Sequence, residues 1–192
     1  MREERPIIAL DFPSFDDVKE FLEHFPEDEK LYVKIGMEFF YAIGPEIVHY
    51  LKGLGHSIFL DLKLHDIPNT VAHGVSSLTR LGASLITLHG QGGPVMMKAA
   101  VDAARESGEK LGVERPKLLA ITALTSFDDE SWTAIGGQLP ISDQVIRLAK
   151  LAKDCGMDGV VCSALEAKMI REACGDDFLI VTPGIRPSSA TT

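Results

Sequence analysis

The sequence is poor in cysteine and has no long apolar run. It contains 192 residues, of which three are cysteines: Cys155, Cys162 and Cys174. An odd number of cysteines without metal-ligand spacing argues against a disulfide framework and against a zinc site, so we expect buried free thiols. The apolar runs are far shorter than the roughly 20 residues that cross a bilayer, so no membrane partner is expected.

Positive charge is also scarce. The chain carries 19 lysine and arginine residues against 28 aspartate and glutamate residues, a formal net charge of -9. Such a chain is a poor match for a nucleic-acid backbone, and we expect no nucleic-acid partner. Small anionic ligands are compatible with it, because local donors bind them. The first residues lack the apolar segment of a signal peptide, so a cytoplasmic location is expected.

What the sequence does contain is a repeated alternation of short apolar segments with longer amphipathic ones. The apolar segments predict strands at Ile7–Phe12, Leu31–Ile35, Ser57–Lys63, Leu85–His89, Lys117–Ala123, Gly159–Cys162 and Phe178–Thr182. The amphipathic segments predict helices at Phe15–His24, Pro45–Leu54, Ile67–Leu81, Pro94–Glu106, Ile141–Cys155 and Ala164–Cys174. This alternation is typical of parallel strands joined by crossover helices, and the length favours a single domain over residues 1–192.

Two architectures use such an alternation, an open doubly wound sheet and a closed (β/α)8 TIM barrel. The open sheet predicts a glycine-rich loop after the first strand, but Asp11 and Pro13 stand there. Polar residues such as Lys34, Asp61 and His89 lie at the predicted strand ends, and a barrel gathers such ends at one mouth. We therefore predict the barrel. An eighth strand is not found in the sequence, so we expect it beyond the segment given, since an open barrel exposes two sheet edges.

One predicted strand carries charges among its apolar residues. All residues of Ile58–Leu64 are apolar except Asp61 and Lys63. Strand side chains that are two residues apart point to the same face, so these two charges would lie together. Burying an acid and a base costs several kcal/mol per ion unless the two are well paired. Either a structural ion pair or a reaction site would explain them, and we favour the reaction site.

The preceding predicted strand contributes a third charge. Lys34 interrupts an apolar strand that would neighbour the one with Asp61 and Lys63, so the three would form a plus-minus-plus cluster. Opposite charges within about 4–6 Å keep one another ionised, which would hold Lys63 as an ammonium able to donate a proton. Asp66 is a candidate second acid. Alternatively, Asp66 simply starts a helix whose first turn contains Pro68.

These residues resemble a known family. The segment Asp61–Thr70, with the order DLKLHDIPNT, resembles the signature of the orotidine 5'-monophosphate decarboxylase family. Three further segments agree with this family in the same order: Ile7–Phe12, Tyr32–Glu38 and Val181–Pro187. The resemblance implies a TIM barrel that works as a homodimer without cofactor or metal. Its expected reaction converts orotidine 5'-monophosphate (OMP) to UMP, the last step of UMP synthesis.

The resemblance also implies roles for individual residues. Lys63 would protonate C6 of the pyrimidine as carbon dioxide leaves, and Asp61 would lie against the substrate carboxylate. Lys34 would bridge Asp61 and a ribose hydroxyl, and Asp11 would also bind the ribose.

The resemblance implies two further groups of residues, one that reaches the active site of a partner subunit and one that contacts the ligand. Asp66, Ile67 and Thr70 would reach the active site of the partner subunit, so that each site is shared between subunits. Thr125 and Arg186 match ligand-contacting positions, and Arg186 suits a bidentate phosphate contact. The family continues past Thr192 with a phosphate loop and an eighth strand, and we expect the same here.

Two alternatives stay open at this point. One is a magnesium-dependent relative, a 3-keto-gulonate-6-phosphate decarboxylase or a hexulose-phosphate synthase, which shares an Asp-x-Lys-x-x-Asp strand. Such enzymes need a carboxylate where Lys34 stands, and a lysine repels a cation. The other is a barrel that binds phosphate without catalysis. Elsewhere, His65 is interpreted as a packing residue, and Asp128–Glu130 as a solvated loop.

Overall fold

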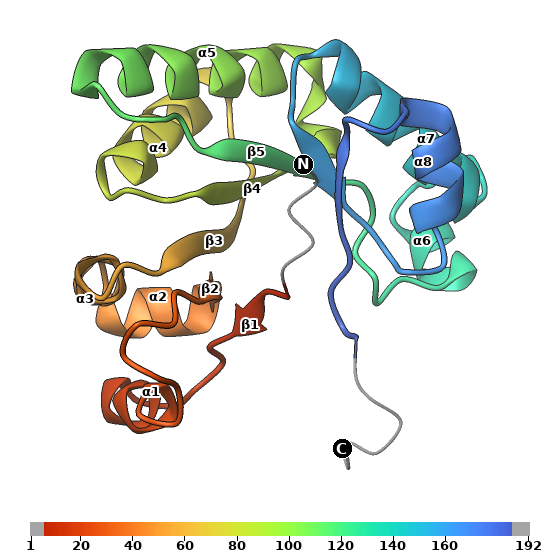
Figure 1. Ribbon diagram of the computed structural model, residues 1–192. Coiled ribbons are helices and arrows are strands. Elements are labelled where there is room, and N and C mark those ends of the chain that lie inside the picture. The colour runs from red at the N-terminus through yellow and green to blue at the C-terminus, as the bar shows by residue number, and fades with distance from the viewer. Residues whose placement is uncertain (1–5, 186–192) are drawn as a thin grey trace.

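The computed structural model describes residues 6–185 and is built around a curved sheet of seven parallel strands (Figure 1). The strands are hydrogen-bonded in chain order, so each pairs with its sequence neighbours. They are β1 (Ile8–Ala9), β2 (Tyr32–Gly36), β3 (Ser57–Leu64), β4 (Leu85–His89), β5 (Lys117–Ile121), β6 (Gly159–Val161) and β7 (Leu179–Val181). All seven predicted strands are therefore present. Strand β1 has two residues where six were predicted, β5, β6 and β7 are one or two residues shorter than predicted, and β3 is one residue longer.

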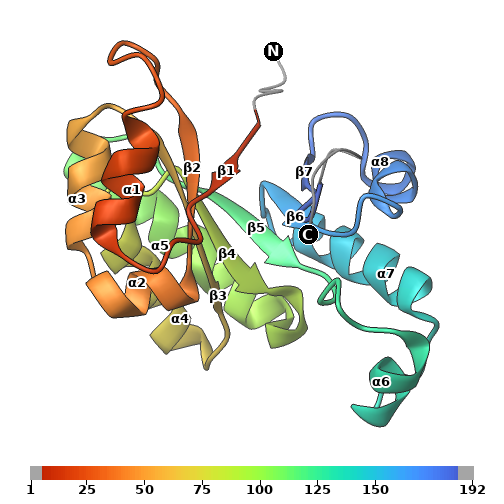
Figure 2. The ribbon, with the colours of Figure 1, turned by 90° about the horizontal axis from the view of Figure 1, so that it is seen from below.

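Helices connect the strands, and most of them lie along the outer side of the curved sheet, whereas α6 stands apart from it (Figure 2). They are α1 (Phe15–Leu22), α2 (Met37–Ile43), α3 (Glu46–Gly53), α4 (Pro68–Arg80), α5 (Gly93–Leu111), α6 (Asp129–Ala134), α7 (Ile141–Asp154) and α8 (Ala167–Cys174), with a short 3-10 turn η1 (Gly90–Gly92). The six predicted helices are confirmed. Over residues 6–185 this architecture is that of a (β/α)8 barrel without its last strand, as predicted.

The two faces of the sheet have different partners. On the outer face, strand residues such as Val33, Ile58 and Ile86 join helix residues in one large buried core. On the inner face the buried cluster contains strand residues, Tyr32, Phe59, Leu85 and Leu119. Because side chains alternate along each strand, the inner face of β2 and β3 also receives Lys34 and Asp61. The charges therefore stand on the inner face of the sheet, alongside this smaller apolar cluster.

Two helices were not predicted. Helix α2 begins directly after β2 and has seven residues, too few for a clear periodic pattern. Helix α6 corrects the interpretation of Asp128–Glu130 as a loop, because Asp128 caps it. The Asp128 carboxylate accepts a hydrogen bond of 2.8 Å from the Ser131 N–H, which satisfies a free donor of the first turn. Trp132 of this helix is buried, and its ring N–H donates a hydrogen bond of 2.9 Å to the Leu139 carbonyl.

The three cysteines are buried and unpaired, as predicted. Burial in apolar surroundings raises the pKa of the Cys162 thiol to about 12, so this thiol stays protonated at neutral pH. Between residues 6 and 185 no helix is long and apolar enough to cross a membrane.

The amino-terminal edge of the sheet carries an ion-pair cluster of its own. Arg115, just before β5, makes two hydrogen bonds of 2.7 and 2.8 Å to the Asp158 carboxylate just before β6. The same carboxylate accepts the Leu118 N–H at 2.8 Å, and Lys117 lies 4.0 Å away. The hydrogen bonds to Asp158 raise the pKa of Arg115. This cluster ties the starts of two strands together.

Candidate active site

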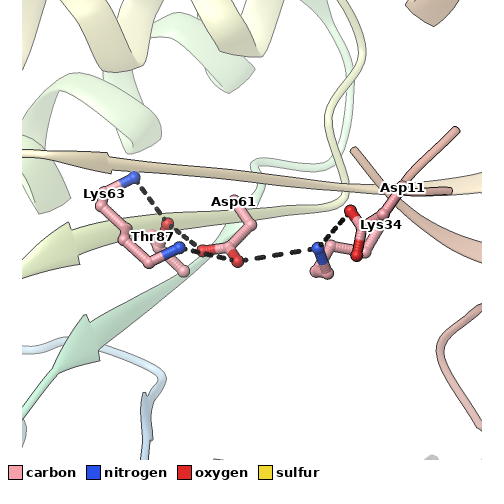
Figure 3. Close-up of polar contacts among 5 residues, drawn as sticks. All are labelled: Asp11, Lys34, Asp61, Lys63 and Thr87. Atoms are coloured by element: carbon pink, nitrogen blue, oxygen red, sulfur yellow. Dashed lines mark hydrogen bonds and ion pairs between the residues drawn. The ribbon is translucent and has the colours of Figure 1, made fainter. Parts of the chain in front are cut away.

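The predicted plus-minus-plus cluster exists at the carboxyl-terminal edge of the sheet (Figure 3). The Lys63 ammonium lies 3.0 Å from Asp61 Oδ2, and the Lys34 ammonium lies 4.0 Å from the same oxygen. Lys34 also lies 3.3 Å from the carboxylate of Asp11, which follows β1. Three neighbouring strands thus bring two bases and two acids together.

The burial of these four side chains is graded. Asp61 and Lys34 are largely buried, with 16% and 19% of their side chains exposed, whereas Asp11 is 68% exposed. Lys63 is intermediate at 28%. Partial burial strengthens the attraction between Lys63 and Asp61 because solvent screens it less. Part of the Lys63 side chain and most of the Asp11 side chain thus remain exposed to solvent.

Strand β3 is irregular where it carries the charges. Leu60 pairs with Ile86 and Leu64 pairs with Leu88, so that Asp61, Leu62 and Lys63 lie opposite the single residue Thr87. Lys63 adopts a φ of +50°, a conformation that residues with a Cβ rarely occupy. The predicted meeting of Asp61 and Lys63 is therefore found, but a bulge brings it about, not the regular alternation that predicted it.

Thr87 is a site residue that the sequence reading missed. Its hydroxyl accepts the Lys63 backbone N–H at 2.9 Å and donates to Asp61 Oδ1 at 3.0 Å (Figure 3). The side chain is fully buried. One signal could have found it: Thr87 is a polar residue inside an apolar strand, and it lies two positions before His89, on the same face of β4.

His89 and His65 pack against each other near Lys63. Their ring centroids are 5.1 Å apart with a tilt of 31°. Burial, followed by the neighbouring His65 and the Lys63 charge, lowers the pKa of His89, while Asp61 acts in the opposite direction. The lowered pKa favours the neutral form of His89 beside the Lys63 ammonium. The packing role predicted for His65 agrees with this contact.

Asp66, Ile67 and Thr70 take no part in the ion pairs of the four-residue cluster. All three are exposed at the start of α4, and the Ile67 side chain is 66% exposed. Asp66 accepts a hydrogen bond of 2.6 Å from the Ile67 N–H, while Ile67 itself is the N-cap and Pro68 the first helical residue. Within residues 6–185 no ion pair joins Asp66 to Lys34 or Lys63.

The remaining predicted residues lie along the chain after β5 and β7. Thr125 is exposed in the loop between β5 and α6. Arg186 lies outside the described residues. In the described part of the chain, no group of three or more histidine, cysteine, aspartate or glutamate side chains could hold a metal ion.

A parallel barrel sheet with paired acids and bases at the carboxyl ends of its strands defines the class: an enzyme of the (β/α)8-barrel type. The chain belongs to the orotidine 5'-phosphate decarboxylase / HUMPS family, whose model matches residues 4–192.

Named relatives are similar over nearly the whole chain. The orotidine 5'-phosphate decarboxylase of Streptococcus sanguinis strain SK36 is 61% identical over 191 residues, which cover 99% of this chain and 80% of the relative. The enzyme of the same name from Streptococcus mutans is 54% identical, with the same coverage.

Solved structures agree with the fold. The orotidine 5'-phosphate decarboxylase of Lactobacillus acidophilus matches with a TM-score of 0.89 and 45% identity, covering 96% of this chain and 82% of that one. An uncharacterized conserved protein from Geobacillus kaustophilus matches with a TM-score of 0.88 and 48% identity, covering 92% and 82%.

Proposed function

We propose that this protein decarboxylates OMP to UMP, with Lys63 as the proton donor. The observation that carries the proposal is the single carboxylate oxygen of Asp61 shared between the ammonium groups of Lys63 and Lys34, at 3.0 and 4.0 Å. The names of the relatives support the substrate, since those at 61% and 54% identity are orotidine 5'-phosphate decarboxylases.

The reaction breaks the bond between C6 of the pyrimidine and its carboxylate. The bonding electron pair stays on C6 as carbon dioxide leaves, so negative charge develops on a ring carbon. An ammonium fixed beside that carbon stabilises the charge and then supplies the proton, forming the new C6–H bond. Lys63 is left as a neutral amine and regains its proton from water. No external electron acceptor is required for this balance.

Asp61 contributes in two ways to this scheme. It holds the Lys63 ammonium in place through the 3.0 Å ion pair. Its negative charge also repels the substrate carboxylate, and this repulsion disappears as carbon dioxide departs. Both effects favour the transition state over the bound substrate.

Four residues are proposed to bind the rest of the substrate. We propose that Asp11 accepts a hydrogen bond from the ribose and that Lys34 donates one to it; the two side chains lie 3.3 Å apart. Thr125 and Arg186 are proposed ligand contacts, with Arg186 holding the phosphate in the loop after β7. Phosphate is remote from C6, so its binding energy serves to position the substrate and to close loops over it.

The family description also includes HUMPS. The alternative function is therefore that of a magnesium-dependent hexulose-phosphate synthase or 3-keto-gulonate-6-phosphate decarboxylase. Lys34 argues for OMP as the substrate. Its ammonium lies among the site carboxylates, 3.3 Å from Asp11 and 4.0 Å from Asp61, where it competes with a divalent cation for both.

The deciding experiment follows the ultraviolet absorbance of OMP with the full-length protein and a chelator present. We expect loss of the orotidine absorbance at an unchanged rate when the chelator is added. Failure of the full-length protein to turn over OMP would refute the proposed function, and turnover abolished by the chelator would point to the metal-dependent alternative.

We further propose that the enzyme is a homodimer in which Asp66, Ile67 and Thr70 complete the site of the partner subunit. Their exposure at the start of α4 supports this assignment, because exposed side chains are available to a second subunit. Mixed dimers of Asp66→Ala and Lys63→Ala subunits test it, because one of their two sites would keep both residues. Mixed dimers that recover no activity would contradict the shared site.

Two broader expectations complete the proposal. We propose that the chain forms a single barrel domain, since the seven strands of the described part belong to one sheet. The enzyme works in the cytoplasm, which the three unpaired cysteines support because thiols persist in a reducing compartment.

A further inference from the structure

Thr87 is a buried residue that contacts both halves of the Asp61–Lys63 pair. Its hydroxyl has one hydrogen, which it donates to Asp61 Oδ1 at 3.0 Å. The same oxygen accepts the Lys63 backbone N–H at 2.9 Å. Because the side chain has no exposed surface, bulk water cannot replace either hydrogen-bond partner if it is lost. Thr87 therefore joins β4 to the two charged residues of β3.

The first contact holds an unfavourable backbone conformation. Lys63 is the only residue other than glycine with a positive φ among residues 6–185. It lies in the bulge where β3 loses its regular pairing with β4, so its N–H lacks a place in the strand ladder. The Thr87 hydroxyl gives that N–H an acceptor. Residues in such conformations persist only where the surroundings hold them.

The second contact orients the Asp61 carboxylate. A carboxylate can rotate about its terminal torsion, which is broad and roughly two-fold. The hydrogen bond from Thr87 occupies Oδ1, and Oδ2 is then turned toward the Lys63 and Lys34 ammonium groups. One hydroxyl thus fixes the backbone that carries the proton donor and the carboxylate that holds it.

We propose that Thr87 is a positioning residue for the decarboxylation, acting through Lys63 and Asp61 without touching the substrate. This inference rests on the proposed function of the site. It requires the hydroxyl, because a methyl group of the same size offers neither the donor nor the acceptor. It predicts a much larger defect in kcat than in KM, since the two hydrogen bonds of Thr87 go to Asp61 and to the backbone of Lys63.

Two pairs of variants that differ by the hydroxyl alone test the role. Thr87→Val keeps the shape of threonine and removes the hydroxyl, and Thr87→Ser and Thr87→Ala form a second pair at smaller volume. Losing a hydrogen bond to a charged group should lower kcat by about ten- to a hundredfold in the Val and Ala variants. KM should stay close to that of the unaltered protein, and Thr87→Ser should recover most of kcat over Thr87→Ala.

A matched control removes a buried hydroxyl elsewhere. Thr79 is 3% exposed in the last turn of α4 and donates to the Val75 carbonyl at 2.8 Å, away from the charges. Thr79→Val should leave kcat unchanged, which separates positioning from a general effect of losing a buried hydroxyl.

Hydrogen exchange of the Lys63 amide gives a reading that is independent of turnover. We expect it to be slow with Thr or Ser at position 87 and fast with Val or Ala. A Thr87→Val or Thr87→Ala protein with unchanged kcat would overturn the role, as would a defect confined to KM or a Ser variant as slow as the Ala variant. If the unaltered protein itself fails to turn over OMP, the proposed function fails instead, and the two failures are thereby distinguished.

Discussion

The two edges of the sheet each carry an aspartate with basic partners, but the two clusters are built differently. At the amino-terminal edge, Asp158 receives both arms of the Arg115 guanidinium at 2.7 and 2.8 Å and the Leu118 N–H as well. At the carboxyl-terminal edge, Asp61 shares one oxygen between two lysine ammonium groups at 3.0 and 4.0 Å. The first arrangement is close and bidentate, whereas the second is looser.

The difference shows what each cluster does. The Arg115–Asp158 pair uses regular strand ends and satisfies both carboxylate oxygens, as a pair that serves stability should. The Asp61–Lys63 pair instead requires a bulge and a positive φ at Lys63, features that cost stability and cluster at functional sites. A flexible lysine also keeps hydrogens available for a ligand, since an ammonium has three donors. Four tests of this contrast follow, in order of expected effect.

The largest effect should follow removal of the proton donor. Lys63→Ala should lower kcat by at least about a thousandfold, because both the proton and the stabilising charge disappear. The matched control is Lys117→Ala at the opposite edge, where Lys117 lies 4.0 Å from Asp158. Absorbance assays should find this control fully active. A Lys63→Ala protein with a nearly normal rate would refute the role of Lys63.

The second variant should lower stability and leave activity unchanged. Asp158→Ala leaves Arg115 without its bidentate partner, and we expect it to lower the free energy of unfolding by about 3 kcal/mol, at the lower end for buried pairs because Arg115 is partly exposed. Urea denaturation measures this loss. Activity per folded molecule should stay unchanged. A fall in kcat without a fall in stability would contradict the assignment of Asp158 to stability and of Asp61 to catalysis.

The third test uses pH at the amino-terminal edge. His56 is buried just before β3, and its Nδ1 accepts the Leu31 N–H at 3.2 Å. Burial, together with the nearby Lys30 charge, lowers the pKa of His56, so the neutral form is favoured in the folded state.

The unfolded chain then binds more protons than the folded one just below pH 6.5. The stability that His56 contributes is present above about pH 6.5 and is lost as the pH falls toward its lowered pKa, by up to about 1.4 kcal/mol per pH unit. Urea denaturation across this range measures it. His56→Asn, which keeps an acceptor that does not titrate, should remove this contribution, and an unchanged pH profile in that variant would contradict the assignment to His56.

The smallest effect is expected for an exposed pair away from both clusters. Lys168 and Glu172 of α8 lie 4.0 Å apart with 89% and 68% of their side chains exposed. Lys168→Ala should change the free energy of unfolding by less than about 0.5 kcal/mol and leave kcat unchanged. Thermal melting and the absorbance assay give the background against which the larger effects are judged.

Much of the fold could be predicted from local patterns. The seven strands are short apolar runs and the six predicted helices have clear periodicity. Each of these patterns can be recognised within one segment, without knowledge of the segments that pack against it. Helices α2 and α6 were missed because each spans seven residues or fewer. Helix α6 depends on the Asp128 cap, which resembles ordinary loop chemistry until Ser131 is seen to donate to it.

The sequence by itself determined the parallel barrel and the charged residues that meet at its mouth, because strand alternation and chain order already place Lys34, Asp61 and Lys63 at neighbouring strand ends. The tertiary structure alone decided how they meet. The bulge in β3, the positive φ of Lys63 and the contact with Thr87 depend on the register between two strands. Register is a relation between distant segments, and no single segment of the sequence contains it.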